Sequence, residues 1–346
     1  MSAVSLVQAL RDPASVAGLD AEGWNELLAA AKAERLIATL AWRLDGQAVP
    51  VEARAVLADA VADAAREAQQ ALWEADRAAH ALAPLGIPVV LLKGTAYAAA
   101  GLKAGEGRFI GDLDILVPRA AMADVERALI AAGWEWVKDD AYDDAYYRQW
   151  MHELPPLIHA ERDRMIDVHH TILPLTARPK PDAAIMLADA VPTTDGLYVL
   201  SPEDRIVHAA AHMLADGDLR GGLRNLWDIH CLCVENAERD QHFCLSLFEQ
   251  AAHHGLTSVV WRALRLTRHL YGTPLTSYCS PINVGYGLRK GDRLFIARLL
   301  ARDGWGRETR KPLVFAFYVR SHLLRMPPLM LARHLLTKWR KGHRPQ

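Results

Sequence analysis

Two aspartates, one residue apart at the start of an apolar run, are the residues of this chain best suited to chemistry. Asp112 and Asp114 lead into the apolar residues 115–117. Side chains alternate between the two faces of a strand, so the two carboxylates are predicted to share one face. Like charges held that close need a cation to offset their repulsion. Mg²⁺ bound to phosphate is a suitable cation, because it prefers carboxylate oxygens and substrate phosphates.

A third carboxylate, Asp167, stands in the apolar stretch 165–169, which is predicted to be a later strand. In nucleotidyl transfer, two Mg²⁺ ions about 3.5–4 Å apart bind the attacking and leaving oxygens. Asp112 and Asp114 can bridge such a pair, and Asp167 can bind the ion that activates the acceptor hydroxyl. The candidate catalytic and metal-binding set is therefore Asp112, Asp114 and Asp167. In the alternative interpretation, Asp112 caps a turn and Asp114 is an exposed strand residue.

A second group of residues is suited to binding phosphate. Lys93, Gly94 and Thr95 stand where the buried strand predicted over residues 87–92 turns into a helix. A glycine there lets backbone amides approach a phosphate, and a helix N-terminus favours an anion. Lys93 can add charge at the beta- or gamma-phosphate, and Arg108 can clamp a triphosphate or the acceptor. The alternative is an ordinary strand-to-helix turn, a solvated lysine and a loop arginine.

Together these residues resemble the core of the polymerase-beta-like nucleotidyltransferase superfamily. Its pattern is a Gly-Ser or Gly-Thr turn after a strand, a hydrophobic-Asp-hydrophobic-Asp strand, and a third carboxylate on a later strand. The chain is more similar to a less characterised bacterial family, with a Lys-Gly turn and an Arg-x-x-x-Asp-x-Asp motif. The resemblance covers roughly residues 88–170, and more loosely the helical region after Ser201. The spacing from Thr95 to Asp112 is longer than the superfamily's, and the Gly-rich loop 101–111 accounts for the extra length.

The resemblance implies a transferase with a bound nucleotide. The expected activity is a Mg²⁺-dependent transfer of NMP from an NTP, such as ATP, to an unidentified hydroxyl or phosphate acceptor, with two Mg²⁺ ions. The alternative is a catalytically inactive nucleotidyltransferase fold that binds nucleotide or a partner protein, which the altered turn and the wide spacing favour. A third hypothesis is an adaptor that acts at a membrane or RNA surface through a basic tail.

The bulk composition is that of a folded globular protein. Its 346 residues are 51% hydrophobic and carry a net charge of -1, and the length allows two or three domains. No apolar run is long enough to span a bilayer, and the N-terminus lacks a signal pattern, so we expect a cytoplasmic protein without a transmembrane segment. The four cysteines have no paired metal-ligand spacing. We interpret them as reduced thiols, mostly in the core.

The C-terminal end of the chain is strongly basic. Residues 310–346 contain nine Lys or Arg and no Asp or Glu, with apolar residues interleaved. Such a segment can contact an anionic surface, namely a membrane, RNA or an acidic face of the same protein. The favoured interpretation is a C-terminal helix that packs on the domain and keeps its cations solvated.

The pattern of elements predicts an α+β fold. A small mixed β-sheet nucleotidyltransferase core, residues 84–175, is expected between an N-terminal helical region, 1–83, and a C-terminal helical region with the basic tail, 200–346. Apolar periodicity predicts helices over residues 51–82, 95–102 and 120–132, and strands over 87–92, 112–117, 134–137, 145–150, 157–160 and 165–169. Residues 101–111 are expected to form a mobile loop, and a Pro-rich linker follows the last strand.

The helical region after Ser201 is expected to close the cleft and select the acceptor. Ser201 is a predicted N-cap, and helices are expected over residues 202–215, 221–235, 241–254 and 257–271. The polar residues predicted to face inward, on the acceptor side, are His208, His212, Arg224 and Asp228, although helix packing explains them almost as well. The i, i+4 spacing of His208 and His212 can bind Zn²⁺, but no Glu follows His208 as in H-E-x-x-H. Of His169 and His170, one is expected to face the site.

Overall fold

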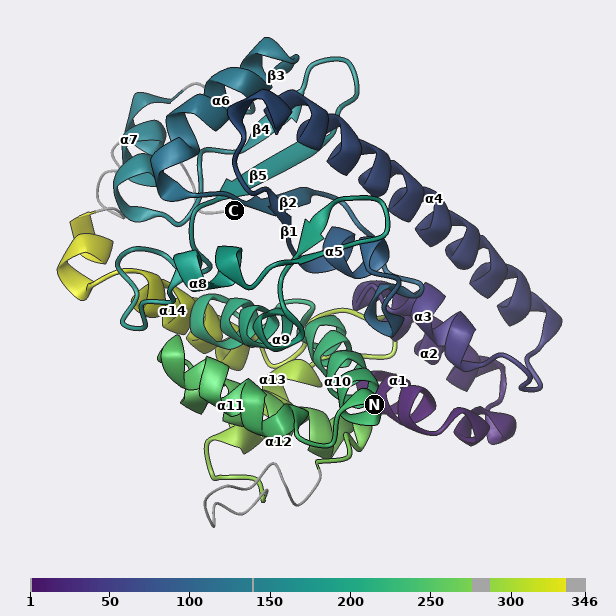
Figure 1. Cartoon of the computed structure of the whole chain (residues 1–346). Helices are drawn as coiled ribbons and strands as arrows, with labels where there is room; N and C mark the ends of the chain where they lie inside the picture. The colour runs from purple at the N-terminus through teal and green to yellow at the C-terminus, as the bar shows by residue number, and fades with distance from the viewer. Residues whose placement is uncertain (1, 139, 276–286, 334–346) are drawn as a thin grey trace.

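The fold is one mixed β-sheet surrounded by helices, in a computed structural model that describes residues 2–138, 140–275 and 287–333 (Figure 1). Within these residues seven strands form one sheet, in the order β3-β4-β5-β2-β1-β7-β6. The strands are β1 (Val90–Leu91), β2 (Leu113–Leu116), β3 (Trp134–Trp136), β4 (Leu157–His159), β5 (Met165–His169), β6 (Val191–Pro192) and β7 (Tyr198–Val199). The predicted α+β fold with helical flanks is confirmed.

The centre of the sheet is the parallel pair of β2 and β5. Asp114 of β2 lies opposite Asp167 of β5, and β2 is antiparallel to β1 on its other side. The residues that alternate with these aspartates, Ile115 and Ile166 among them, are buried and belong to the hydrophobic core. One face of the strand pair is therefore apolar, and the aspartates lie on the other.

The helices surround this sheet. Within the described residues they are α1 (Ser2–Arg11), α2 (Ala21–Ala33), α3 (Ile37–Arg43), α4 (Val51–Leu82), α5 (Lys93–Ala99), α6 (Met122–Ala131), α7 (Ala141–Trp150), α8 (Ala183–Ala188), α9 (Pro202–Ala211), α10 (Gly222–Arg239), α11 (Phe243–His253), α12 (Thr257–Tyr271), α13 (Asp292–Leu299) and α14 (Lys311–Arg325). Figure 1 shows α4 running from the N-terminal helices to the sheet. It contacts α3 at one end and α5 and α6 at the other, so it ties the two regions together.

Local signals in the sequence explain the helix boundaries. The predicted N-cap at Ser201 is confirmed, because its hydroxyl accepts a hydrogen bond from the Asp204 amide at 3.2 Å. Helix α4 has its predicted bounds, and it buries small residues at helical spacing, such as Ala60, Ala64 and Ala71. The predicted helix over 202–215 is divided, because α9 is followed by a π-helical turn, His212–Asp216.

Residues 145–150 were predicted to be a strand, and this prediction is wrong. They form the second half of α7. The Tyr and Trp residues there favour strands, but ion pairs at helical spacing stabilise the helix. Arg148 contacts Asp144, four residues earlier, at 2.8 Å, and both oxygens of Glu126 on α6, each at 2.8 Å.

The Pro-rich linker contains a short hairpin that the sequence pattern did not predict. Strand β6 pairs antiparallel with β7, and β7 adds to the sheet in parallel with β1. Pro192 is tolerated because β6 is an edge strand, where its missing N–H is not needed. The sheet therefore continues past residue 175, the predicted end of the core.

The loop over residues 101–111 was predicted to be mobile, but it is packed against α3. The hydroxyl of Thr39 donates to the carbonyls of Glu106 and Gly107 at 3.1 and 3.2 Å. Gly107 has a φ of +62°, and an added Cβ would lie 2.5 Å from the backbone of Ala38. Only glycine fits there, so this glycine fixes the loop rather than loosening it.

The remaining predictions on the chain as a whole have mixed outcomes. Among the described residues, none of the helices has the length and apolar character needed to cross a membrane. Cys231 and Cys233 are buried free thiols, as predicted. Cys244 is disulfide-bonded, so the prediction of a reduced thiol is wrong for it, and Cys279 lies outside the described residues.

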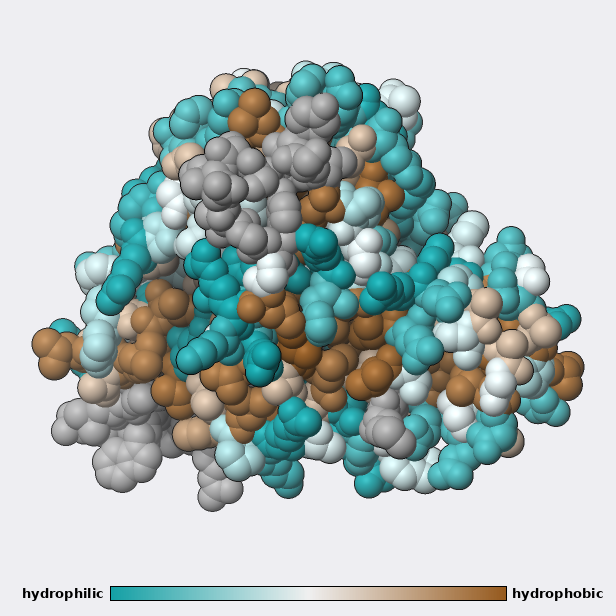
Figure 2. All heavy atoms as spheres, turned by 90° about the horizontal axis from the view of Figure 1, so that it is seen from below, coloured by the Kyte–Doolittle hydropathy of each residue, from teal (hydrophilic) through white to brown (hydrophobic). Residues whose placement is uncertain are grey.

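The basic C-terminal segment is described only as far as residue 333. Its helix α14 exposes three apolar residues at a spacing of four, Phe315, Val319 and Leu323. Figure 2 shows hydrophobic residues in a band across the face of the molecule seen from below. Contact of the segment with an anionic surface stays a prediction.

Candidate metal and nucleotide site

Three carboxylates converge at the centre of the sheet. Asp112, Asp114 and Asp167 each offer an oxygen that lies within 4.8 Å of the others. Asp114 and Asp167 are register partners in the parallel pair of β2 and β5. Asp112, one residue before β2, is exposed, whereas Asp114 is only 2% exposed. The alternation within β2 and the pairing with β5 therefore bring the whole predicted carboxylate set together.

Asp114 is held by two side chains. Lys93 Nζ donates to Asp114 Oδ1 at 2.6 Å, and His169 Nε2 lies 3.0 Å from the same oxygen. Burial alone would raise the pKa of Asp114, but the charge of Lys93 and the hydrogen bond from His169 outweigh burial and hold the pKa well below its usual range. Asp114 is therefore a fixed, ionised carboxylate.

Asp167 is the carboxylate whose negative charge is not balanced by a contact with a cationic side chain among the described residues. Its Oδ1 is buried and has no hydrogen-bond partner among the described residues. Burial first, and then the charges of Asp114 and Glu153, raise the pKa of Asp167 to about 7. A divalent cation would supply both the missing charge and a partner for that oxygen, and hard cations prefer carboxylate donors. The donor set therefore fits an ion of the Mg²⁺ type.

Lys93 has a strained backbone. Its φ is +50°, in the left-handed region that residues other than glycine rarely adopt. It is the first residue of α5, and its side chain is 24% exposed. Strain of this kind is often found at functional sites. Here the conformation accompanies the contact of the ammonium group with Asp114.

Gly94 leaves room for Arg108. An added Cβ at Gly94 would lie 2.6 Å from Arg108 Nε and 3.2 Å from Ile110 Cγ1. The next residue, Thr95, is 1% exposed, and its hydroxyl has no hydrogen-bond partner among the described residues. Gly94 was predicted to let a phosphate approach the backbone, but the Arg108 side chain occupies the space beside it.

Arg108 belongs to a second cluster of buried charge, formed by Arg108, Arg224 and Asp228, which we call the arginine–aspartate cluster. Asp228 pairs with Arg108 through one oxygen, and the other oxygen accepts from Arg224 at 2.6 and 2.8 Å. Arg224 also donates to the carbonyl of Ala104 at 2.9 Å and contacts the hydroxyl of Thr39. The cluster ties α10 to the loop before β2. Among the described residues, Asp228 is not one of the carboxylates that converge with Asp114.

His208 and His212 lie close enough to Lys93 for its charge to affect them. Burial is the main cause that lowers the pKa of both side chains, with Lys93 the next, and that of His212 falls to about 3. Their ring centroids are 6.5 Å apart. His212 begins the π-helical turn, and such turns often occur at functional sites. The lowered pKa favours the neutral imidazole in both side chains.

Two residues at the site were not found from the sequence. They are His152 and Glu153. Glu153 forms an isolated β-bridge with His169, and His170 N donates a hydrogen bond to His152 O at 2.8 Å. His169 faces Asp114, whereas His170 is buried elsewhere and its pKa is lowered to about 4, mainly by burial. The only local signal for His152 and Glu153 was a titratable pair within an apolar stretch, and their position depends on a long-range pairing.

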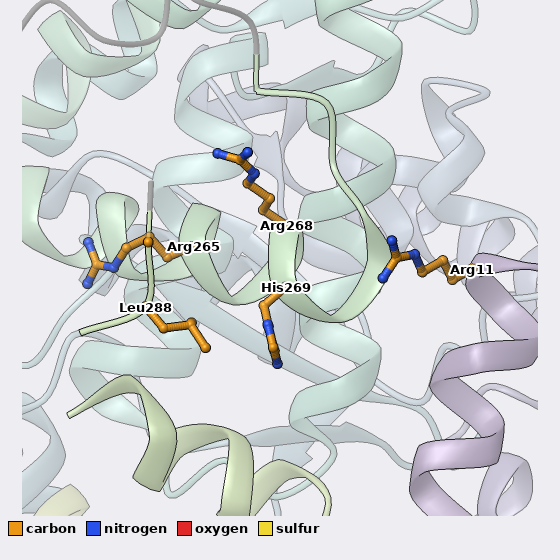
Figure 3. Close-up of a pocket in the computed structure, with 6 residues that line it drawn as sticks. Arg11, Arg265, Arg268, His269 and Leu288 are labelled. Carbon is orange, nitrogen blue, oxygen red and sulfur yellow. The ribbon is translucent and has the colours of Figure 1, made fainter. Parts of the chain in front are cut away.

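A cavity of about 570 Å³ lies away from this site, next to α1 and α12 (Figure 3). Figure 3 shows that its labelled residues come from separate segments of the chain. Arg265 is already paired with Asp292, at 2.7 Å. Among the described residues, the lining is cationic and includes no carboxylate: it consists of Arg11, Arg265, Arg268, His269, Gly287 and Leu288. This cavity therefore cannot hold the metal that the carboxylates indicate.

The core combines three features of a nucleotidyltransferase. Its mixed sheet has an Asp-x-Asp motif at one strand, a third Asp on the neighbouring parallel strand, and a lysine at the start of the helix that follows β1. A family model described as an uncharacterised nucleotidyltransferase matches residues 20–272, and the chain belongs to this family. The matched region contains the three carboxylates and the helices from α2 to α12. The resemblance drawn from Lys93, Gly94, Arg108 and the Asp pair is confirmed. No curated protein matches the chain.

Proposed function

We propose that this protein is a Mg²⁺-dependent nucleotidyltransferase, which moves NMP from an NTP to a hydroxyl or phosphate acceptor. The observation that supports this most is the convergence of three carboxylates within 4.8 Å, one of them with an uncompensated charge. Asp112, Asp114 and Asp167 would hold two Mg²⁺ ions. These ions would supply charge stabilisation for the attacking oxygen and for the pyrophosphate that leaves.

The protein's own contribution is to hold these oxygens in place. The parallel register of β2 and β5 sets the spacing of Asp114 and Asp167, and the exposed Asp112 opens the group to solvent. Lys93 is partly exposed at the edge of the same group, so we propose that its ammonium group contacts a phosphate oxygen. Preorganised charge of this kind is a main source of catalysis, because it needs no rearrangement during the reaction.

The remaining nucleotide residues are proposed with different roles. Thr95 has a hydroxyl without a partner among the described residues, and we propose that it donates to the nucleotide after a small side-chain adjustment. Gly94 and Arg108 act together: the glycine admits the arginine, and the arginine supports the turn that carries Lys93. Arg108 then positions Lys93 for contact with a phosphate, and it does not bind the triphosphate itself.

On the acceptor side, His208 and His212 are the better candidates. Burial and the charge of Lys93 favour the neutral form of both imidazoles, and a neutral imidazole can accept a hydrogen bond from an acceptor hydroxyl. Arg224 and Asp228 were predicted to act on the same side. Their side chains are only 6% and 3% exposed and bind each other, so we propose that they act there through packing alone.

The test uses the full chain with each NTP labelled at the alpha-phosphate, Mg²⁺ and a fractionated metabolite extract. The expected result is label on an extract component, together with released pyrophosphate. Asp112→Asn is the matched control, because the substitution is exposed and nearly isosteric. Label transfer that is equal in the wild type and Asp112→Asn would overturn the proposal.

A catalytically inactive nucleotide-binding module is the second candidate. The observation that favours it is the contact between Lys93 Nζ and Asp114 at 2.6 Å, where an internal cation already compensates a carboxylate. Two measurements separate the candidates. An enzyme requires Mg²⁺ for productive nucleotide binding and releases pyrophosphate, whereas the binding module binds nucleotide without Mg²⁺ and releases none.

A further inference from the structure

We propose that His152, Glu153 and His169 form a second metal site, which binds a borderline divalent ion such as Zn²⁺. The site adjoins the carboxylates but uses two imidazole nitrogens and one carboxylate oxygen. Nitrogen donors of this kind suit Zn²⁺, whereas Mg²⁺ prefers oxygen alone. The proposal does not depend on nucleotidyl transfer.

The distances between the donor atoms suit a shared ion. Glu153 Oε2 lies 3.4 Å from His169 Nδ1 and 3.6 Å from His152 Nε2. Both distances are longer than a good hydrogen bond, which is about 2.7–3.2 Å. Zn²⁺ bonds of about 2.0–2.2 Å in a tetrahedral site put neighbouring donors roughly 3.3–3.6 Å apart. Glu153 Oε2 therefore lies at the required separation from both nitrogens, and the three residues each offer a donor atom within 4.8 Å of the others.

Burial gives an independent observation. His152 is 7% exposed and His169 is 2% exposed, so water has little access to either ring. The Nδ1 atom of each ring has no hydrogen-bond partner among the described residues. A buried nitrogen without a partner costs roughly 1–3 kcal/mol. A metal ion bound to His169 Nδ1 would remove that cost for His169.

The contact with Asp114 selects the tautomer that a metal needs. His169 Nε2 lies 3.0 Å from Asp114 Oδ1, so this nitrogen carries the proton and donates it to the carboxylate. Nδ1 is then left with a lone pair that faces Glu153. Metal-bound histidines usually donate their second N–H to a carboxylate in this way. His169 would thus connect the two sites, with its Nδ1 on Zn²⁺ and its Nε2–H on Asp114.

The backbone holds this geometry without the ion. Glu153 and His169 are partners in an isolated antiparallel bridge. On either side of it, Leu154 N donates to Val168 O at 2.9 Å, and His170 N donates to His152 O at 2.8 Å. The donors are therefore fixed by main-chain hydrogen bonds, which favours binding of a metal by a preformed site.

The test is zinc binding by the metal-stripped full chain, titrated in competition with a chromophoric chelator. The expected result is one Zn²⁺ per chain, and Co²⁺ in its place should give the visible absorption of a four- or five-coordinate nitrogen-containing site. His152→Ala and Glu153→Gln should each weaken Zn²⁺ binding by at least about 100-fold, since changes to outer ligands alone cost roughly 10–100-fold.

The controls separate loss of the zinc ligands from loss of the folded structure. His170→Asn removes a neighbouring histidine outside the cluster, and Asp112→Asn removes a carboxylate of the other site, so both should bind Zn²⁺ as the wild type does. Thermal unfolding followed by circular dichroism checks that each variant is folded. Zinc lost in Asp112→Asn but kept in His152→Ala would place the ion on the carboxylates and overturn the proposal. No zinc binding by the wild type would overturn it too, and would leave His169 as an imidazolium between Asp114 and Glu153.

Discussion

Two clusters of charged side chains meet at the start of α5, and they differ in how well their charges are compensated. In the arginine–aspartate cluster, both oxygens of Asp228 accept from arginines, and Arg224 has further partners in Thr39 and Ala104. In the carboxylate cluster, three acids converge, and Lys93 and His169 both contact Asp114. Asp167 keeps an oxygen without a partner among the described residues. Asp228 therefore has its counterions within the described chain, whereas the carboxylate cluster has an excess of negative charge that a cation would balance.

This difference separates a structural role from a functional one. Removing one partner from a compensated buried pair leaves a charge without a counterion and destabilises the fold. Removing an acid that no cation compensates from a cluster with excess negative charge relieves repulsion, so it costs function and not stability. Proteins commonly keep such a destabilised arrangement where they bind a ligand.

The largest expected effect is on stability, in the compensated cluster. Asp228→Asn should lower the free energy of unfolding by about 3–5 kcal/mol, because Arg108 and Arg224 lose their counterion while they stay buried. Urea denaturation followed by circular dichroism measures this. The control is Glu238→Gln, whose side chain is 61% exposed and pairs only with exposed Lys103, so the change should be below about 1 kcal/mol. Equal effects of the two substitutions would remove the structural role of the cluster.

The next effect is on activity, in the carboxylate cluster. Asp112→Asn should reduce Mg²⁺-dependent transfer by roughly 10²–10³-fold, the size seen when one preorganised group is removed from a site. Its stability should be unchanged, because Asp112 is exposed. Asp114→Asn should lose the same activity and also some stability, because Lys93 and His169 lose their anionic partner. A loss of activity in Asp114→Asn alone would reduce the site to one essential carboxylate.

Asp167 should make the stability of the metal-free protein depend on pH. Its pKa is about 7 in the folded chain, against an ordinary value of 3.8. Between these values the folded chain keeps a proton that the unfolded chain has lost, so the contribution of Asp167 to stability is highest at low pH and falls as pH rises to about 7. Asp167→Asn should remove this dependence and raise Tm at pH 8, by roughly 2–4 °C for each kcal/mol of relief. The measurement is Tm against pH without divalent ions.

The same experiment has an internal check. Mg²⁺ should raise the Tm of the wild type at pH 8 and have little effect on Asp167→Asn, because the ion and the substitution relieve the same repulsion. A Tm difference between the wild type and Asp167→Asn that stays constant between pH 4 and pH 7 would mean that another group compensates Asp167.

The carboxylates could be predicted because their placement follows from local rules. Asp112 and Asp114 are separated by a single residue at the start of a strand, and Asp167 stands in an apolar strand pattern of its own. Strand alternation fixes which face each one takes. Parallel pairing of neighbouring strands then brings Asp114 and Asp167 together.

The parts that sequence reasoning missed depend on contacts far apart in the chain. Glu153 reaches the site through a bridge to His169, and Gly94 is required by Arg108, which lies on the following loop. The strand predicted at residues 145–150 failed because Tyr and Trp favour strands locally, while Arg148 pairs with Glu126 on another helix. Local propensity does not contain such pairings, so they could not be predicted from one sequence.

The smallest expected effect concerns Lys93. It tests whether Mg²⁺ can replace the ammonium group beside Asp114, whereas the arginines beside Asp228 are fixed counterions. Lys93→Met removes the ammonium group that contacts Asp114, so Mg²⁺ should bind more tightly, by roughly 3- to 10-fold or about 1 kcal/mol. Nucleotide should bind more weakly and with less dependence on salt, since the phosphate loses one positive charge.

Lys93→Gly is the matched control for the backbone. It removes the same charge, but glycine adopts the φ of +50° without strain. Effects shared by the two substitutions therefore come from the charge, and differences between them come from the turn. The measurement is calorimetric titration of Mg²⁺ and of nucleotide. If both substitutions weaken Mg²⁺ binding as much as nucleotide binding, Lys93 is a fixed support for Asp114, as Arg224 is for Asp228, and the two clusters differ less than their contacts indicate.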